Sequence, residues 1–147
     1  MAIDITAEVT VNAPPARVFA YAIDPANERE WIGGLVESKP LSEGPIAAGS
    51  QVARVAKFAG RRIEYVNEVT QIEPDAMLAM RSIKAPFPMQ ITYRFEAVDG
   101  GTRMTNRVQG GPGGLMALFG PLMAMGVKRN VSADLRRLKA AVEGNAP

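Results

Sequence analysis

Apolar and polar residues alternate over residues 3–11, where every second side chain is apolar. The apolar set is Ile3, Ile5, Ala7, Val9 and Val11. A period of two indicates a β-strand with one buried face. Pro14 and Pro15 follow, which predicts that the strand ends and a short helix begins. Asp24-Pro25 repeats this signal, so we expect a second short helix that ends near Trp31.

Six further strands are predicted by strand-like patterns that turn-forming residues separate. They cover residues 35–41, 50–58, 61–72, 77–83, 90–97 and 102–109. The turns include Glu73-Pro74-Asp75 and Asp99-Gly100-Gly101, which are rich in residues that favour tight turns. Short connections imply that neighbouring strands are antiparallel.

The chain ends in a predicted helix that begins at Pro121 and stops near Gly144. Its apolar residues are spaced by three and four positions and form one stripe: Ala124, Val127, Val131, Leu135, Leu138 and Val142. At about 1.5 Å per residue such a helix is roughly 33 Å long, enough to cross a seven-stranded sheet. We therefore predict one α+β domain over residues 1–147 with a helix-grip fold. A curved, seven-stranded antiparallel sheet, two short helices and the long C-terminal helix would enclose an apolar cavity.

Composition narrows the chemistry of this domain. The 147 residues are 47% hydrophobic, carry a net charge of +2 and include no Cys and no His. Thiolate nucleophiles, disulfides and the commonest metal ligand are therefore excluded, and we expect neither a metal nor a cofactor. The sequence contains no run of five or six basic residues, so we do not expect nucleic acid as a partner. The first residues lack the pattern of a signal peptide, so we predict a cytoplasmic protein.

The order of elements and several local motifs resemble the SRPBCC (START-like) superfamily, and within it the polyketide cyclase/dehydrase group. The resemblance rests on Val11-Asn-Ala-Pro-Pro-Ala-Arg-Val-Phe, on Asp24-Pro25 through Trp31, on Gly101-Thr102-Arg103 and on the terminal helix. It covers nearly the whole chain. It implies a cavity between sheet and helix that binds a lipid, a polyketide, a hormone or another apolar molecule. Some members are cyclases or hydrolases, and no shared catalytic motif exists to transfer, so the catalytic residues stay unknown.

Strand alternation predicts which side chains line the cavity. The inner positions are Ile63, Tyr65, Asn67 and Val69, then Met89, Ile91, Tyr93 and Phe95, and finally Thr102, Met104, Asn106 and Val108. A mostly apolar wall with a few neutral polar groups is typical of a site for a small apolar ligand. The other interpretation is that these polar groups satisfy one another or buried waters.

Two strands leave the direction of an arginine open. Over residues 50–58, either Val52, Arg54, Ala56 and Phe58 face inward, or Ala53 and Val55 do; over 77–83, either Leu78, Met80 and Ser82 do, or Met77, Ala79, Arg81 and Ile83 do. A buried arginine needs an anion. The inner strand faces offer no carboxylate, so an inward Arg54 or Arg81 would indicate a ligand carboxylate or enolate oxygen. A solvated surface arginine is the alternative.

Two further features have a functional and a structural interpretation. Trp31 either contacts the ligand or anchors the packing near the cavity. Small residues near the start of the long helix, Gly120 and Ala124, leave room for a ligand beside Val127 and Val131. The apolar segment 115–125 predicts a flexible gate, a homodimer contact or a peripheral membrane contact, unless it folds back and buries its side chains.

Three functions compete on this evidence. A binding protein for an apolar small molecule needs only the cavity and an entrance. A cyclase, aromatase or dehydratase also needs a proton donor, and without His or Cys the candidates are Tyr65, Tyr93, Arg54, Arg81 and a carboxylate such as Glu37. An interaction module would act through residues 115–125. We rank binding before enzyme, and enzyme before interaction.

Overall fold

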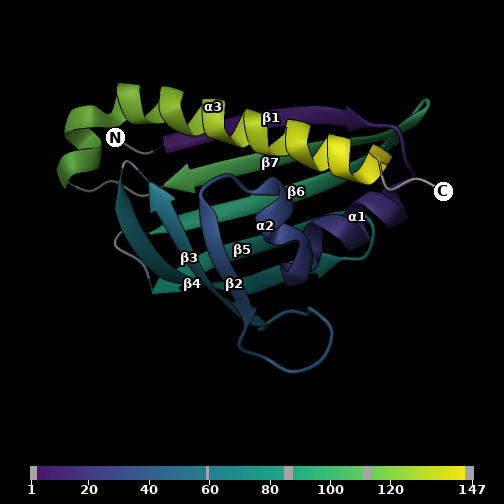
Figure 1. Ribbon diagram of the computed structural model, residues 1–147, viewed down its shortest axis with the longest axis horizontal. Coiled ribbons are helices and arrows are strands. Elements are labelled where there is room, and N and C mark those ends of the chain that lie inside the picture. Colours follow the sequence, from purple (N-terminus) through teal and green to yellow (C-terminus); the bar gives the residue numbers. More distant parts are fainter. Residues whose placement is uncertain (1–2, 59, 85–87, 111–113, 145–147) are drawn as a thin grey trace.

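The computed structural model describes residues 3–58, 60–84, 88–110 and 114–144, with the backbone alone at residues 3, 58, 61 and 114–124 (Figure 1). The strands are β1 (Ile3–Val11), β2 (Leu35–Pro40), β3 (Gln51–Phe58), β4 (Arg61–Glu73), β5 (Met77–Lys84), β6 (Met89–Val98) and β7 (Gly101–Gly110). The helices are α1 (Pro15–Ile23), the 3-10 turn η1 (Pro25–Asn27), α2 (Glu28–Trp31) and α3 (Gly114–Gly144).

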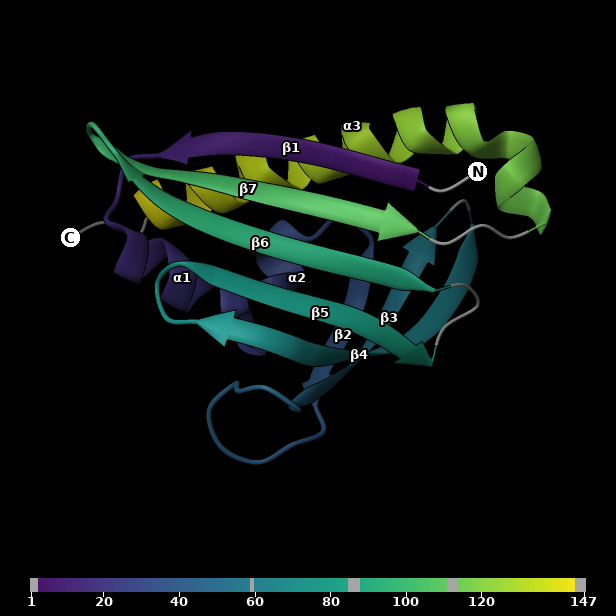
Figure 2. The same cartoon turned by 180° about the vertical axis from the view of Figure 1, so that it is seen from behind.

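All seven strands form one antiparallel sheet in the order β1-β7-β6-β5-β4-β3-β2. Strands β2 to β7 neighbour one another in chain order, while β1 pairs with β7 from Ile3 opposite Gly110 to Val11 opposite Thr102. The sheet curls into a half-barrel. Helices α1, α2 and α3 lie on the same side of it, in front of the sheet in Figure 1 and behind it in Figure 2. The predicted helix-grip fold is confirmed.

The concave face of the sheet carries the side chains that alternation predicts. On β7 the inward set of Thr102, Met104, Asn106 and Val108 is buried, and on β6 Tyr93 and Phe95 are buried. The two strands whose direction was open are now settled. Val52 and Arg54 face inward on β3, and Leu78 and Met80 do so on β5. The interior of the half-barrel is therefore apolar except for a few polar side chains.

The long helix starts earlier than its sequence predicts. We expected a start at Pro121, but α3 begins at Gly114 and runs for 31 residues. An isolated helical glycine costs only about 1 kcal/mol relative to alanine, so the glycines here do not stop the helix. Pro121 lies inside α3, where a proline bends the axis. The first turns of α3, green in Figure 1, run in a different direction from the rest.

The described part of α3 packs as its apolar stripe predicts. Val131, Leu135, Leu138 and Val142 are buried in the core, and Val127 is half-buried against it. Arg17 at the N-terminal end of α1 donates from Nη2 to the carbonyl of Val142 at 2.8 Å and ties α1 to the end of α3. None of the helices, over the residues described, is long and apolar enough to cross a membrane.

The start of β7 shows why Gly101 and Thr102 belong together. A Cβ atom on Gly101 would lie 2.0 Å from the Val11 carbonyl oxygen, so only glycine fits this close approach of two strands. Thr102 is fully buried, and its hydroxyl donates to the Ala13 carbonyl at 2.7 Å. These contacts fix the end of β1 and the entry into α1, so Gly101 and Thr102 have an architectural role.

Candidate functional site

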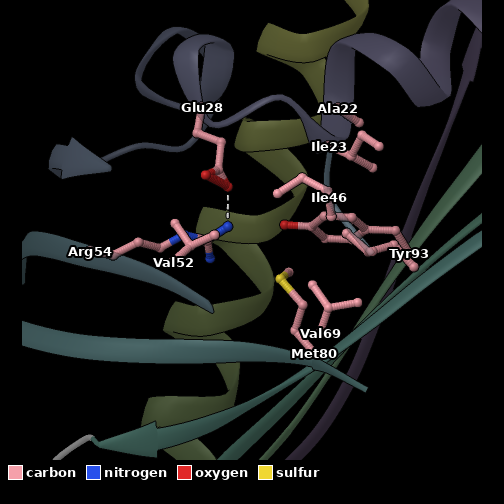
Figure 3. Close-up of a pocket in the computed structure, with 10 residues that line it drawn as sticks. Ala22, Ile23, Glu28, Ile46, Val52, Arg54, Val69, Met80 and Tyr93 are labelled. Carbon is pink, nitrogen blue, oxygen red and sulfur yellow. Dashed lines mark hydrogen bonds and ion pairs between the residues drawn. The ribbon is translucent and has the colours of Figure 1, made fainter. Parts of the chain in front are cut away.

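A small pocket lies on the concave face of the sheet, beneath α1 and α2 (Figure 3). Its lining is Ala22, Ile23, Glu28, Ile46, Val52, Arg54, Val69, Leu78, Met80 and Tyr93. The space open to the centre of a water molecule is about 10 Å³. That is roughly the room one water needs, so the pocket is too narrow for a larger molecule in this conformation.

A buried ion pair crosses the pocket. Arg54 on β3 and Glu28 on α2 are each 3% exposed, and Nη2 of Arg54 contacts Oε2 of Glu28. The other carboxylate oxygen of Glu28 accepts a hydrogen bond from the Ser38 hydroxyl at 2.7 Å. Burial opposes the charged form of Arg54, but the Glu28 carboxylate, with Tyr93 and Tyr65, outweighs it and raises the pKa of the guanidinium above its ordinary value. Arg54 therefore stays positively charged, and it is paired with Glu28.

Tyr93 on β6 completes the polar end of the pocket. Its ring is buried, and its hydroxyl points toward the Glu28–Arg54 pair in Figure 3. Burial raises the pKa of the Tyr93 phenol, and Glu28 and Tyr65 raise it further, while Arg54 works in the opposite direction. The phenol stays protonated at physiological pH, so it is available as a hydrogen-bond donor.

Several buried polar atoms near this end have no partner among the described residues: Nε of Arg54, Nδ2 of Asn67, Oδ1 of Asn106 and Nε1 of Trp31. Asn106 lies opposite Tyr93 in the β6–β7 register, and Asn67 lies opposite Val52 in the β3–β4 register. An unpaired buried polar group costs about 1–3 kcal/mol, so protein interiors rarely leave several in one region. The concave face is therefore apolar but holds polar atoms that remain able to bond.

The sequence of the chain matches a known protein family. The family model described as polyketide cyclase / dehydrase and lipid transport matches residues 2–143. The chain belongs to this family. No curated protein sequence matches the chain.

Solved structures similar to this family member share its fold. TTHA0849 from Thermus thermophilus is 19% identical over 98% of this chain and 99% of its own, with a TM-score of 0.84. The Zhui aromatase/cyclase from a Streptomyces species is 19% identical over 97% of this chain and 94% of its own, with a TM-score of 0.81. The di-domain ARO/CYC StfQ from the steffimycin biosynthetic pathway is 13% identical, and the match covers 98% of this chain and 51% of StfQ, with a TM-score of 0.82.

Within this polyketide cyclase / dehydrase family member, only some residues predicted to bind a ligand lie at the pocket. Arg54 and Tyr93 line it. Tyr65 lies opposite Arg54 in the β3–β4 register and is half-buried. Asn67, Asn106 and Phe95 are buried on the same face of the sheet.

The placement of Arg81 is the clearest departure from the predicted site. Its side chain is 57% exposed and faces Glu68 Oε1 at 3.3 Å on the outer face of the sheet. In the β4–β5 register Arg81 lies opposite Glu68, so a charged partner is available without entering the pocket. The inward alternative for Arg81 is therefore wrong, and Glu37, named as a possible proton donor, is exposed on β2 and does not line the pocket.

The predicted ligand contacts on α3 are described only in part. Val131 is buried in the core, Val127 is half-buried, and the side chain of Ala124 is not among those described. The same holds for residues 115–124 of the apolar segment, whereas Met125 at its end is 69% exposed. Homodimer and membrane contacts through this segment stay predictions.

Trp31 is a packing anchor that also adjoins the pocket. It is fully buried, and its ring meets the ring of Tyr93 edge to face with centroids 5.7 Å apart. The end of α2 is tied to α3 by Asp134, whose Oδ1 accepts from the Gly33 amide at 2.8 Å and contacts Arg137. Arg137 Nε in turn donates to the Trp31 carbonyl at 3.1 Å. The position of α2, and so of Glu28, depends on these contacts.

Glu28 is the charged pocket residue that the sequence prediction missed. Strand alternation predicts no carboxylate on the inner faces of the strands, and it makes no prediction for a short helix. Glu28 lies three positions before Trp31 on the single turn of α2, and residues so spaced share a helix face. Because a tryptophan in that position was expected to be buried, the same spacing could have indicated a buried Glu28.

Proposed function

We propose that the protein binds a small, mainly apolar molecule between the sheet and its helices, with an oxygen of the ligand at Arg54 and Tyr93. The observation that carries this proposal is the cluster of the Arg54 cation, its partner Glu28 and the protonated phenol of Tyr93 in a mainly apolar concave face. Sites of this composition fix the orientation of a ligand through a few polar atoms and gain affinity from apolar contact. The description of the family and the name of the Zhui aromatase/cyclase support the same class of ligand.

A ligand larger than water requires the narrow pocket to widen, and the loop between β2 and β3 is the part best suited to move. Ile46 from this loop lines the pocket, whereas residues 43–45 and 47–49 around it are exposed. Gly44 and Gly49, on either side of Ile46, have positive φ angles of 82° and 91° and hold turns that other residues rarely adopt. Displacement of Ile46 would join the pocket to solvent without disturbing the sheet.

Two measurements test the binding proposal. Mass spectrometry of an organic extract of the purified protein, against a mock purification, would detect a bound lipid or aromatic molecule. Titration with neutral aromatic compounds of increasing size would be followed by the emission of Trp31, the only tryptophan of the chain, which adjoins Tyr93. We expect saturable quenching or a spectral shift. A silent titration together with a clean extract would overturn the proposal.

A second candidate function is a cyclase or dehydratase reaction, and Tyr93 is the observation that favours it. A protonated phenol beside a fixed cation can donate to a carbonyl oxygen and stabilise the negative charge that develops there. Loss of one such donor lowers turnover about 100-fold to 1,000-fold in other enzymes.

Replacement of the phenol separates these two functions. If the protein is an enzyme, Tyr93→Phe is expected to lower kcat by about 100-fold on a polyketone substrate while changing affinity little. If it is a carrier, the variant keeps its ligand and there is no turnover to lose. Tyr21→Phe is the matched control, because the Tyr21 hydroxyl binds Glu30 at 2.8 Å outside the pocket. A wild-type turnover that survives Tyr93→Phe would exclude Tyr93 as the donor.

A further inference from the structure

The charge of the pocket is already balanced before any ligand arrives. Of the lining residues only Glu28 and Arg54 are charged, and they contact each other. Residues 108–127, which include the start of α3, contain no charged residue in the sequence, and residues 85–87 contain none. The polar end of the pocket is therefore strongly polar but has no net charge.

The presence of Glu28 changes the class of ligand that the buried Arg54 indicates. An inward Arg54 with no carboxylate nearby would have required an anionic ligand group. Glu28 takes that role, so a ligand carboxylate would enter as a third charge beside an existing carboxylate. Glu28 would repel that charge as much as Arg54 attracts it. The cost of removing the ligand carboxylate from water would therefore not be offset.

A neutral oxygen meets the opposite situation. The Nε–H of Arg54 has no partner among the described residues, and the Tyr93 hydroxyl points toward the ion pair (Figure 3). Both are donors that a carbonyl or hydroxyl oxygen can accept from without bringing a charge into the interior. An ionised guanidinium also makes a stronger hydrogen bond than a neutral donor does.

We propose that Glu28 makes this pocket select neutral oxygen-bearing ligands, ketones or phenols, and reject carboxylates such as ionised fatty acids. The inference rests on the proposed binding function and names the class of ligand for the same site. Glu28 is then a specificity-determining residue that acts through the charge it contributes, with no direct bond to the ligand required.

The first test uses the wild-type protein and a pair of compounds that differ mainly in charge. Acetylnaphthalene and naphthoate, substituted at the same ring position, have nearly the same shape, but only naphthoate is an anion at neutral pH. Calorimetric titration is expected to show acetylnaphthalene binding at least about tenfold more tightly. Equal affinity, or a preference for naphthoate, would overturn the inference. If neither compound binds, nor any larger pair of the same design, the proposed binding function itself fails.

The second test changes the charge balance. Glu28→Gln leaves Arg54 without its anion, so naphthoate is expected to become the preferred ligand and to raise the melting temperature of this variant more than acetylnaphthalene does. The double variant Glu28→Gln with Arg54→Gln has no charge at the site and is expected to lose the reversed preference. Glu37→Gln on the exposed side of β2 is the matched control and keeps the wild-type preference. A preference for the ketone that survives in Glu28→Gln would exclude Glu28 as its cause.

Discussion

The buried pair of Glu28 and Arg54 adds little to stability when intact, but removal of either residue alone is expected to be strongly destabilising. Removing two charges from water costs several kcal/mol per ion, and their attraction offsets this only with good hydrogen bonding. Glu28 has that support from Ser38, whereas Nε of Arg54 has no partner among the described residues. The intact pair is therefore close to neutral for stability, while either half alone is an uncompensated buried charge.

Arg54 is buried and Arg81 is exposed, so replacing each of them compares the stability cost of losing a buried and an exposed ion pair. Arg54→Gln is expected to lower the free energy of unfolding by about 3–5 kcal/mol, because Glu28 would remain buried without its cation. Arg81→Gln removes an exposed pair with Glu68 and is expected to cost less than about 1 kcal/mol. Urea denaturation of both variants measures the difference. Losses of similar size would contradict the burial of Arg54.

Asp134 gives the stability of the protein a component that depends on pH. Burial raises the pKa of this carboxyl above its ordinary value of 3.8, although the Gly33 amide and Arg137 act in the opposite direction. The folded state therefore binds the proton more tightly than the unfolded state does. This component of stability is fully present below pH 3.8 and is lost as the pH rises through the higher pKa of the folded state.

The variant Asp134→Asn removes that titration and keeps an oxygen for the Gly33 amide. We expect the free energy of unfolding of the wild type minus that of the variant to fall as the pH rises through the acid range. Denaturation across a series of acid buffers measures it. A difference that stays constant or rises with pH would show that the carboxyl is not destabilised by its surroundings. Asp4 is unsuitable as a target, because its exposed pair with Arg107 lowers its pKa and gives the opposite slope.

At the scale of elements, the pocket depends on one short helix and one loop laid over a continuous sheet. The strands supply Arg54 and Tyr93 on a rigid hydrogen-bonded frame, while α2 supplies Glu28 and the β2–β3 loop supplies Ile46. The loop is fixed at its ends, where the Gly49 amide donates to the Val69 carbonyl at 2.8 Å and the Leu41 amide to the Gln51 carbonyl at 2.8 Å. Under the proposed entry route, displacement is therefore expected only between these two fixed ends, in the stretch that carries Ile46.

Shortening Ile46 tests whether this loop controls access. Ile46→Ala is expected to speed ligand association several-fold and to cost about 1 kcal/mol of stability, less than a fully buried isoleucine would. Stopped-flow measurement of Trp31 emission gives the rate. Leu41→Ala, an exposed position at the start of the same loop, is the matched control and should leave the rate unchanged. Unaltered association in both variants would place the entrance elsewhere.

Periodicity predicted the elements well where one face of a strand is apolar and the other is polar. On β6 and β7 it identified the inward side chains correctly, because the two faces differ in polarity. On β3 it left the direction of Arg54 open. Arg54 is charged but lies on the same face as the apolar positions Val52 and Ala56, so neither face of β3 is purely apolar. The partner of Arg54 lies far along the chain in another element, and only the folded arrangement brings the two together. The sequence does not predict the early start of α3, because glycines and Pro121 interrupt the helical pattern there.

At the scale of the whole molecule, the fold persists across structures that share only 13–19% of their residues with this chain. A pattern of inward apolar positions can be filled by many sequences of suitable volume, so sequence identity can fall while the architecture remains. Contacts that depend on one particular residue are fewer. The close approach at Gly101 and the buried Thr102–Ala13 hydrogen bond are of this kind.

The pairing of β1 with β7 has a consequence for how the chain is made. β1 is synthesised well before β7, its neighbour in the described part of the sheet, with Ile3 opposite Gly110. During elongation β1 therefore has an apolar face and an unpaired backbone, which are features that promote association with other chains. Closing so long a loop also places the protein among slow-folding topologies. The β1–β7 pairing forms only after β7 has been synthesised, so the edge of β1 is open to association with other chains until then.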